Sequence, residues 1–173
     1  MFVLRDFDAA DGAHVDALGV AAFEQYRDAY ADWPAFRARI AAMSSLAAAG
    51  EIIVAVRDGR IVGAVAYIGP GRPKPDFFQP EWPIMRMLVV APEVRGQGAG
   101  RALAQECIRR ARRDGATMFA LHTSELMQVA LPMYERMGFR RSAEAPDIHG
   151  VKYGIFVKPL DALPSSQIFT NPA

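Results

Sequence analysis

The stretch Arg95-Gly96-Gln97-Gly98-Ala99-Gly100 lies between an apolar run at residues 87–91 and a helix-like segment at residues 101–114. A strand, a glycine-rich turn and a helix start are the layout of an anion cradle. Glycines let the backbone approach a phosphate closely, and the first N–H groups of a helix have no partner within it. The helix dipole adds partial positive charge at the same place. The sequence therefore predicts a phosphate-binding site at this turn.

Three phosphate-binding patterns compete for the turn. The P-loop needs Gly-Lys-Ser/Thr, which follows neither of its first two glycines. The dinucleotide fingerprint needs a third glycine where Arg101 stands and an acidic residue where Ala116 stands. The third pattern, R/Q-x-x-G-x-G/A, is matched by Arg95, Gly98 and Gly100. Only this third pattern fits the spacing.

The matched segment resembles the acyl-CoA-binding motif of the GCN5-related N-acetyltransferase (GNAT) family. A second block about 30 residues later looks like that family's A-x-x-x-Y-E-x-x-G-F segment; it consists of Ala130, Tyr134, Glu135, Gly138 and Phe139. Two blocks in the family's order and spacing are a stronger indication than either alone. The recognisable part runs from residue 84 to residue 140.

The predicted order of elements is β-α-α-β-β-β-α-β-α-β-β. Residues 52–57 and 60–68 read as two strands joined by Asp58-Gly59, a strong hairpin signal. A strand–helix–strand order over residues 84–122 implies a parallel crossover. We therefore expect a mixed α/β (α+β) fold with a central, mostly antiparallel sheet and one parallel pair, flanked by helices. The resemblance implies a GNAT-like acyl-CoA N-acyltransferase fold, in which that parallel pair is splayed.

Other elements are predicted from apolar periodicity and turn residues. Five prolines predict a loop over residues 69–83. Pro132 falls inside a helix predicted from residue 123 or 124 to residue 137, so this helix either starts later, near Gln128, or is kinked. Helices are also expected over residues 11–30 and 32–49, each opened by an aspartate cap, and closing strands over 139–143 and 151–158. One domain is expected at residues 1–160, followed by a C-terminal tail at 161–173.

The resemblance implies a site for acetyl-CoA, bound as a co-substrate. Backbone N–H groups of the turn would surround its pyrophosphate, and the acyl arm would lie along the preceding strand. The residues implicated are Leu88, Val89, Val90, Arg95, Gly96, Gln97, Gly98, Ala99, Gly100 and Arg101. The two arginines are candidates for phosphate contacts, the alternative being a solvated loop edge.

Acetyl transfer to an amine needs an acid for the departing thiolate. The resemblance implies that Tyr134 has this role; the alternative is a half-buried aromatic on a helix face. The family often has an asparagine seven residues before this tyrosine, where the chain has Met127. That difference removes an amide able to bind the pantetheine arm.

The base remains open among three residues and a water chain. His122 ends a predicted strand, and its reference pKa of about 6.5 suits a base; a structural histidine with a hydrogen bond is the alternative. Glu81 and Glu125 are the other options. Many family members place a glutamate four residues before the position of Leu88, where this chain has Ile84.

These features lead us to expect an acetyl-CoA-dependent N-acetyltransferase that acetylates a primary amine of a small molecule or peptide by direct attack in a ternary complex. The alternatives are a non-catalytic acyl-CoA-binding or regulatory module, and a structural domain whose glycine turn binds sulfate or nothing. Four acids near the expected acceptor site are candidates to attract a cationic amine: Asp28, Asp32, Asp76 and Glu81.

Composition limits the remaining classes. Of 173 residues, 51% are hydrophobic and 23% charged, and the net charge is +1, so we expect no nucleic-acid or membrane partner. A single cysteine and the lack of a signal-like N-terminus favour a cytoplasmic protein. No His, Cys or Asp spacing resembles a metal site. The resemblance makes a homodimer one expectation, with Ile168-Phe169 as a candidate docking segment.

Overall fold

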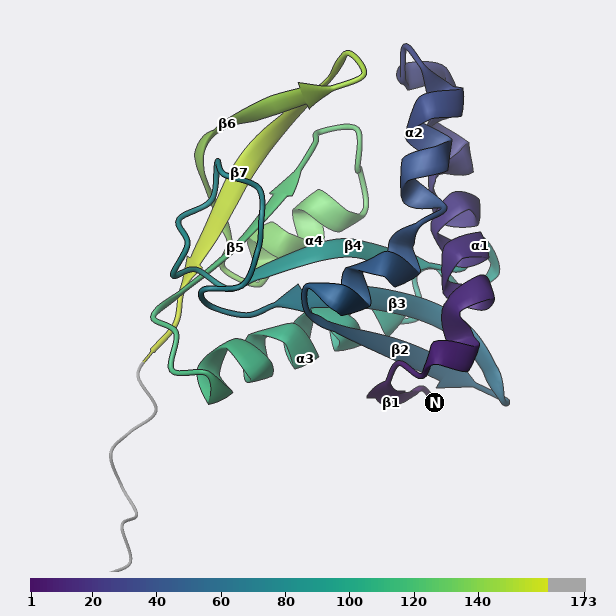
Figure 1. Cartoon of the computed structure of the whole chain (residues 1–173), viewed down its shortest axis with the longest axis horizontal. Helices are drawn as coiled ribbons and strands as arrows, with labels where there is room; N and C mark the ends of the chain where they lie inside the picture. The colour runs from purple at the N-terminus through teal and green to yellow at the C-terminus, as the bar shows by residue number, and fades with distance from the viewer. Residues whose placement is uncertain (162–173) are drawn as a thin grey trace, which may run out of the picture.

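A seven-stranded mixed sheet forms the centre of the computed structural model, which describes residues 1–161 (Figure 1). The strand order is β1-β2-β3-β4-β5-β7-β6, and only β4 and β5 run parallel. The predicted fold class and order of elements are confirmed. The strands are β1 (Val3–Asp6), β2 (Glu51–Arg57), β3 (Arg60–Ile68), β4 (Ile84–Val90), β5 (Met118–Thr123), β6 (Arg140–Ile148) and β7 (Val151–Pro159).

Helices cover both faces of this sheet. They are α1 (Gly12–Phe23), α2 (Trp33–Ile40), α3 (Ala99–Arg113) and α4 (Ala130–Arg136), with single 3₁₀ turns at Ala9–Asp11, Glu24–Ala29, Met43–Ala48 and Pro92–Val94. A Cβ placed on Gly19 of α1 would lie 3.6 Å from Cε of Met87, and one on Gly100 of α3 would lie 3.5 Å from Cγ2 of Val90. Strand β4 is therefore packed between α1 on one face and α3 on the other.

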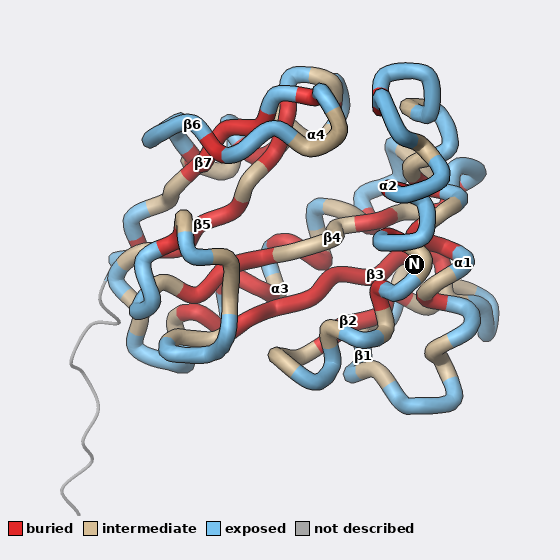
Figure 2. The backbone as a smooth tube through the Cα atoms, turned by 45° about the horizontal axis from the view of Figure 1, so that its top comes forward, coloured by how far each residue is buried: buried red, intermediate tan, exposed pale blue. Residues whose placement is uncertain are grey.

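The parallel pair separates almost as soon as it forms. Strands β4 and β5 are in register at Ile84 and Ala120 alone, where the amide of Ala120 donates to the carbonyl of Pro83 over 3.1 Å. By contrast, β5 pairs with β7 over six positions. Figures 1 and 2 show β4 and β5 diverging from that point. The splay implied by the family resemblance is present.

A β-bulge interrupts β4 beside the splay. Arg86 pairs with Ala66 and Val89 with Ala64, so that Met87 and Leu88 both lie opposite a single residue of β3. Met87 has a φ of 55°, which is uncommon for a residue with a long side chain. A bulge of this kind changes the direction of the neighbouring side chains. The sequence analysis did not predict it.

The N-terminal helices are shorter than predicted. Helix α1 ends at Phe23, where the 3₁₀ helix Glu24–Ala29 follows directly. Helix α2 ends at Ile40, and two residues separate it from the 3₁₀ helix Met43–Ala48. Asp32 caps α2 as expected, because its carboxylate accepts from the amide of Ala35 over 3.0 Å. Asp11 does not cap α1; its carboxylate instead accepts from Arg5 at 2.7 Å and from a backbone amide at 2.9 Å.

Two C-terminal predictions are corrected in detail. Helix α4 starts at Ala130, so Pro132 lies in its first turn, where a missing N–H leaves no bond unmade. Strand β6 extends through Pro146, at an irregularity of its pairing with β7, and the hairpin turn is only His149-Gly150. The segment Ile168-Phe169 lies outside the described residues. Within residues 1–161, none of the helices has the length and apolar character that crossing a membrane requires.

Burial follows the sheet, with most buried backbone in the strands and in the face of α3 that covers them (Figure 2). One charged side chain among the described residues, that of Arg110, is both buried and paired with several acids. The Arg110 side chain is 8% exposed and donates to Asp6 at 2.6 Å, to Glu51 at 2.9 Å and to Glu106 at 2.9 Å. It therefore joins β1, β2 and α3 through three carboxylates.

We predict that Arg110→Met lowers the free energy of unfolding by about 2 kcal/mol, because it leaves three acids without their shared partner. Hydrogen bonds from Arg109 and Arg110 hold the pKa of Glu106 at about 2, against an ordinary value of 4.5. This carboxylate stabilises the fold above pH 4.5, and that contribution is lost as the pH falls toward 2. Urea unfolding at pH 7 and pH 3 measures both effects.

The matched control is Arg109→Met, since the exposed Arg109 shares the Glu106 carboxylate. We expect it to cost no more than about 0.5 kcal/mol. Equal losses for the two variants, or a larger gap between Arg110→Met and the parent protein at pH 3 than at pH 7, would contradict the role given to Arg110.

Candidate active site

The glycine turn forms one wall of a cavity of about 300 Å³, which we call the donor cavity. Strand β4, the last turn of α1 and part of α4 form the rest. Of the ten residues predicted to bind the cofactor, nine line it: Leu88, Val89, Val90, Arg95, Gly96, Gly98, Ala99, Gly100 and Arg101. The exception is Gln97, whose side chain accepts from Arg57 and donates to the Glu93 carbonyl.

The turn has a backbone suited to an anion. Gly96 and Gly98 have φ values of 75° and 93°, which side chains disfavour. Gly98 is also the N-cap of the fifteen-residue α3, and no side chain caps this helix end. Its first N–H groups therefore remain free for a ligand at the wall of the donor cavity.

The two arginines of the turn are placed differently. One guanidinium nitrogen of Arg95 donates to the carbonyl of Ala22 over 2.9 Å and so attaches the turn to the last turn of α1. Arg101 is exposed at the edge of the donor cavity. In this structure, Arg101 is thus the freer candidate for a phosphate contact.

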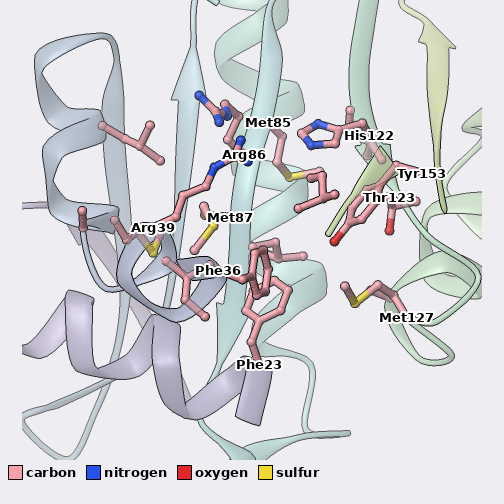
Figure 3. Close-up of a pocket in the computed structure, with 18 of the residues that line it drawn as sticks. Phe23, Phe36, Arg39, Met85, Arg86, Met87, His122, Thr123, Met127 and Tyr153 are labelled. Atoms are coloured by element: carbon pink, nitrogen blue, oxygen red, sulfur yellow. The ribbon is translucent and has the colours of Figure 1, made fainter. Parts of the chain in front are cut away.

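A second cavity, of about 380 Å³, lies where β4 and β5 have separated. We call it the acceptor cavity; its walls come from α2, β4, β5, β7 and α4 (Figure 3). It shares four lining residues with the donor cavity: Phe23, Leu88, Met127 and Ala130. The two cavities therefore adjoin at the bulged part of β4.

Tyr134 lies on the wall of the acceptor cavity. The residue is 6% exposed and packs edge-on against Phe139, with ring centroids 5.8 Å apart. Burial raises the pKa of its phenol well above the ordinary value of 10. Tyr134 therefore keeps its proton at neutral pH and can donate it.

His122 lies on the same wall, on β5. Its ring packs 5.4 Å from Phe77 and from Tyr153. Burial, together with the positive charges of the nearby Arg86 and Arg39, lowers the pKa of His122 to about 4. The imidazole is thus neutral at pH 7. Its Nδ1 is buried and has no hydrogen-bond partner within residues 1–161. At this atom, the structure therefore lacks the hydrogen bond expected of a structural histidine.

The carboxylate residues predicted to act as the base or to attract the amine do not line this site. Glu81 and Glu125 are exposed and line neither cavity. The same holds for the three aspartates expected to attract a cationic amine, Asp28, Asp32 and Asp76. Among the described residues, moreover, no group of three or more His, Cys, Asp or Glu side chains is placed to hold a metal ion.

Among the polar residues of the acceptor cavity that were not predicted are Arg39, Arg86 and Tyr153. For Arg86 a signal existed, because it is the single charged residue in the run of β4. Tyr153 required knowledge of the tertiary structure, since its hydroxyl bonds that of Tyr30 over 2.6 Å. Nearby, the amide of Ala31 donates to the carbonyl of His149 over 2.7 Å. These contacts join the β6–β7 hairpin to the N-terminal helices across the cavity.

A glycine turn opening a helix, a splayed parallel pair and two adjoining cavities together indicate a protein that binds an acyl carrier on one side of a sheet opening. Comparison with known families agrees. The model of the Acetyltransferase (GNAT) family matches residues 15–139. The chain belongs to the GNAT acetyltransferase family.

Its relatives are similar over part of their length. Probable N-acetyltransferase family 8 member 5 of Mus musculus is 33% identical over 115 residues, 64% of this chain and 47% of that protein. N-acetyltransferase 8F1 of Rattus norvegicus is 35% identical over 58% of this chain and 44% of its own length. The chain thus spans about half the length of the curated relatives it matches.

Solved structures share the fold. An acetyltransferase of Corynebacterium glutamicum, described as histone acetyltransferase HPA2 and related acetyltransferase, superposes with a TM-score of 0.72 at 23% identity, covering 95% of this chain and 98% of that one. The yncA protein of Salmonella typhimurium, whose structure contains its cofactor acetyl-CoA, has a TM-score of 0.66 at 18% identity over 96% and 98% of the two chains.

We predict that NMR titration of His122 gives a pKa of about 4 and that Arg86→Met raises it, because one of two neighbouring positive charges is removed. Burial remains, so the pKa stays below 6.5. The spectrum of His122→Gln assigns the signal. Arg37→Met, an exposed change on α2 outside the cavity, serves as the matched control and leaves the pKa in place. A wild-type value near 6.5 would show that His122 is not enclosed as described.

Proposed function

We propose that this chain is an acetyl-CoA-dependent N-acetyltransferase that acetylates a primary amine by direct attack in a ternary complex. The observation that carries the proposal is the meeting of the two cavities. The glycine turn lines the donor cavity, Tyr134 and His122 line the acceptor cavity, and Leu88 borders both. A thioester lying along β4 from the turn would reach the place where an acceptor can meet it.

The donor cavity suits the cofactor. Acetyl-CoA supplies the acetyl thioester. The free N–H groups at the start of α3 would hold its pyrophosphate, with Arg101 adding positive charge. The separated edge of β4 would offer backbone groups to its amide-containing arm, because this edge has no partner strand beyond Ile84. The acetyl-CoA in the Salmonella neighbour of the same fold supports this assignment.

In the transfer step, the amine nitrogen forms a bond to the thioester carbon, and the carbon–sulfur bond breaks. Tyr134, which lines the acceptor cavity and is protonated at neutral pH, supplies a proton to the departing sulfur. The amine gives up a proton to the imidazole of His122 or to water. Burial and two nearby arginines disfavour the protonated imidazole, so His122 would pass this proton on quickly.

A second candidate is a non-catalytic module that binds acyl-CoA. Two observations favour it: among the described residues that line the acceptor cavity there is no carboxylate to act as a base, and Met127 stands where an asparagine is frequent in the family. Such a module would bind acetyl-CoA without transferring its acetyl group to any amine.

The cofactor site is tested by thermal unfolding with acetyl-CoA at about 100 times its dissociation constant. We expect about 2.7 kcal/mol of added stability, a rise of roughly 5–10 °C in Tm. Gly98→Asp abolishes this rise, since it places a negative charge where the pyrophosphate would bind.

The matched control is Gly59→Asp in the β2–β3 turn. Gly59 has a φ of 74° and open surroundings, as Gly98 does, and it lies outside both cavities. The control shares the backbone strain but keeps the acetyl-CoA shift. Loss of the shift in both variants, or in neither, would remove the glycine turn as the binding site.

The acid is tested with Tyr134→Phe. We predict that kcat falls by about 100-fold, the low end of what a general acid contributes, while the acetyl-CoA thermal shift is retained. Release of free thiol in the presence of an accepted amine measures kcat. An unchanged kcat would assign Tyr134 to packing alone; binding of acetyl-CoA without turnover by the wild type would favour the non-catalytic module.

A further inference from the structure

The charges of the acceptor cavity all have one sign. Its twenty lining residues include Arg39 and Arg86 and, within the described chain, neither aspartate nor glutamate. The other titratable side chains of its wall, those of His122, Tyr134 and Tyr153, are uncharged at pH 7. A cavity that received a simple cationic amine would be expected to carry the opposite charge.

Of the two arginines in the acceptor cavity, Arg86 gives the stronger argument for an anionic ligand. It lies half-buried on β4, and no carboxylate of the described residues pairs with it. Burial lowers the pKa of this guanidinium, and Arg39 lowers it further. Arg110, which is buried, has three carboxylate partners. The half-buried Arg86 has none among the described residues.

Arg39 adds a second charge at the same place. It lies in the last turn of α2, and its side chain extends from that helix toward Arg86 on β4 (Figure 3). No carboxylate pairs with Arg39 either within residues 1–161. Arg39 is exposed and Arg86 is half-buried; their positive charges repel each other, and an anion between them would relieve this repulsion. Their planar arrays of N–H donors match the two oxygens of a carboxylate.

Most of the remaining wall is apolar. Facing the arginines and His122 are aromatic, methionine and aliphatic side chains, chiefly Phe23, Phe36, Met43, Met85, Leu121 and Ile148. A volume of about 380 Å³, part of which the acetyl group would fill, accepts a molecule of amino-acid size.

Building on the acetyltransferase activity proposed above, we infer that the acceptor is an α-amino acid with an apolar side chain, whose carboxylate is bound by Arg86 and Arg39. The carboxylate would neutralise the two guanidinium groups. The apolar side chain would contact the methionine and aromatic wall, and the amine would face the thioester at Leu88. Amines that lack a carboxylate, and polyamines above all, are repelled by the same two arginines.

The test compares amines that differ by a carboxylate alone: L-phenylalanine with 2-phenylethylamine, and L-leucine with 3-methylbutylamine, with spermidine as a polycation. Mass spectrometry of the acetylated product gives kcat/KM. We expect the amino acids to be preferred in both pairs. Arg86→Met lowers kcat/KM for the amino acids about 50-fold, mainly through KM, and so removes most of the preference for the carboxylate-bearing member of each pair.

Arg37→Met is the matched control, because Arg37 is an exposed arginine of the same helix outside the cavity; it retains the preference. A general disturbance of the fold by Arg86→Met would lower all the amines alike, which would contradict the inference. Equal or better acetylation of 2-phenylethylamine or spermidine by the wild type would also overturn it while leaving the acetyltransferase in place.

If no acetylated product is found, a binding measurement tests the carboxylate site separately from the acetyltransferase activity. Calorimetric titration of L-phenylalanine and L-leucine into the protein saturated with CoA measures the anion site directly. Saturable binding that Arg86→Met abolishes, without transfer to any amine, would support the carboxylate site and refute the transferase. If neither amino acid is bound or acetylated, the inference is wrong.

Discussion

The rest of the structure depends on the early separation of β4 from β5. After the single register position at Ile84 and Ala120, two strands in the middle of a sheet no longer pair, and their backbone groups lose the partners that a sheet normally supplies. The fold compensates at a distance. The β6–β7 hairpin continues pairing with β5 and reaches the N-terminal helices through the Tyr30–Tyr153 and Ala31–His149 contacts. The opening is thereby kept as a cavity with walls instead of collapsing into core, and the edge of β4 stays available.

The bulge at Met87 and Leu88 gives this opening its chemistry. Because the side chains of a strand alternate between its two faces, an extra residue changes which of them face α1 and which face α3. Met87 contacts α1, and Val90 lies beside the first turn of α3. In the same short strand, Leu88 borders both cavities, and Arg86 lies on the wall of the acceptor cavity. A positive φ at a methionine costs free energy, and such strain is concentrated where a function requires it.

Local signals predicted much of this arrangement, and nonlocal ones did not. The glycine turn, the following helix and the Asp58-Gly59 hairpin follow from residues adjacent in the chain, and all were found in place. The ends of α1, α2 and α4 were misjudged because tertiary packing, not propensity, determines where a helix stops. The donor cavity was predicted, since nine of its residues belong to one motif and the strand before it. The arginines of the acceptor cavity were not predicted, because Arg39 and Arg86 come together only when α2 and β4 form walls of the same cavity. Glu81 was one candidate base from its place in the chain, and its loop leaves it exposed. Placing Tyr153 near His122 also needs the full sheet.

In a chain of nearly neutral net charge, Arg110 and Arg86 have different roles. Arg110 stabilises the fold, whereas Arg86 is proposed to bind the acceptor. Arg110 is satisfied within the fold, so removing it should cost stability and little specificity. Arg86 is half-buried beside another arginine and has no counterion among residues 1–161, an arrangement that a bound anion would relieve. The same positive field acts on the reacting amine: it lowers the proportion in the ammonium form, which cannot attack a thioester, and it keeps His122 neutral and able to accept a proton. A carboxylate on the acceptor reconciles these demands, since it brings the amine into a cavity that would otherwise repel it.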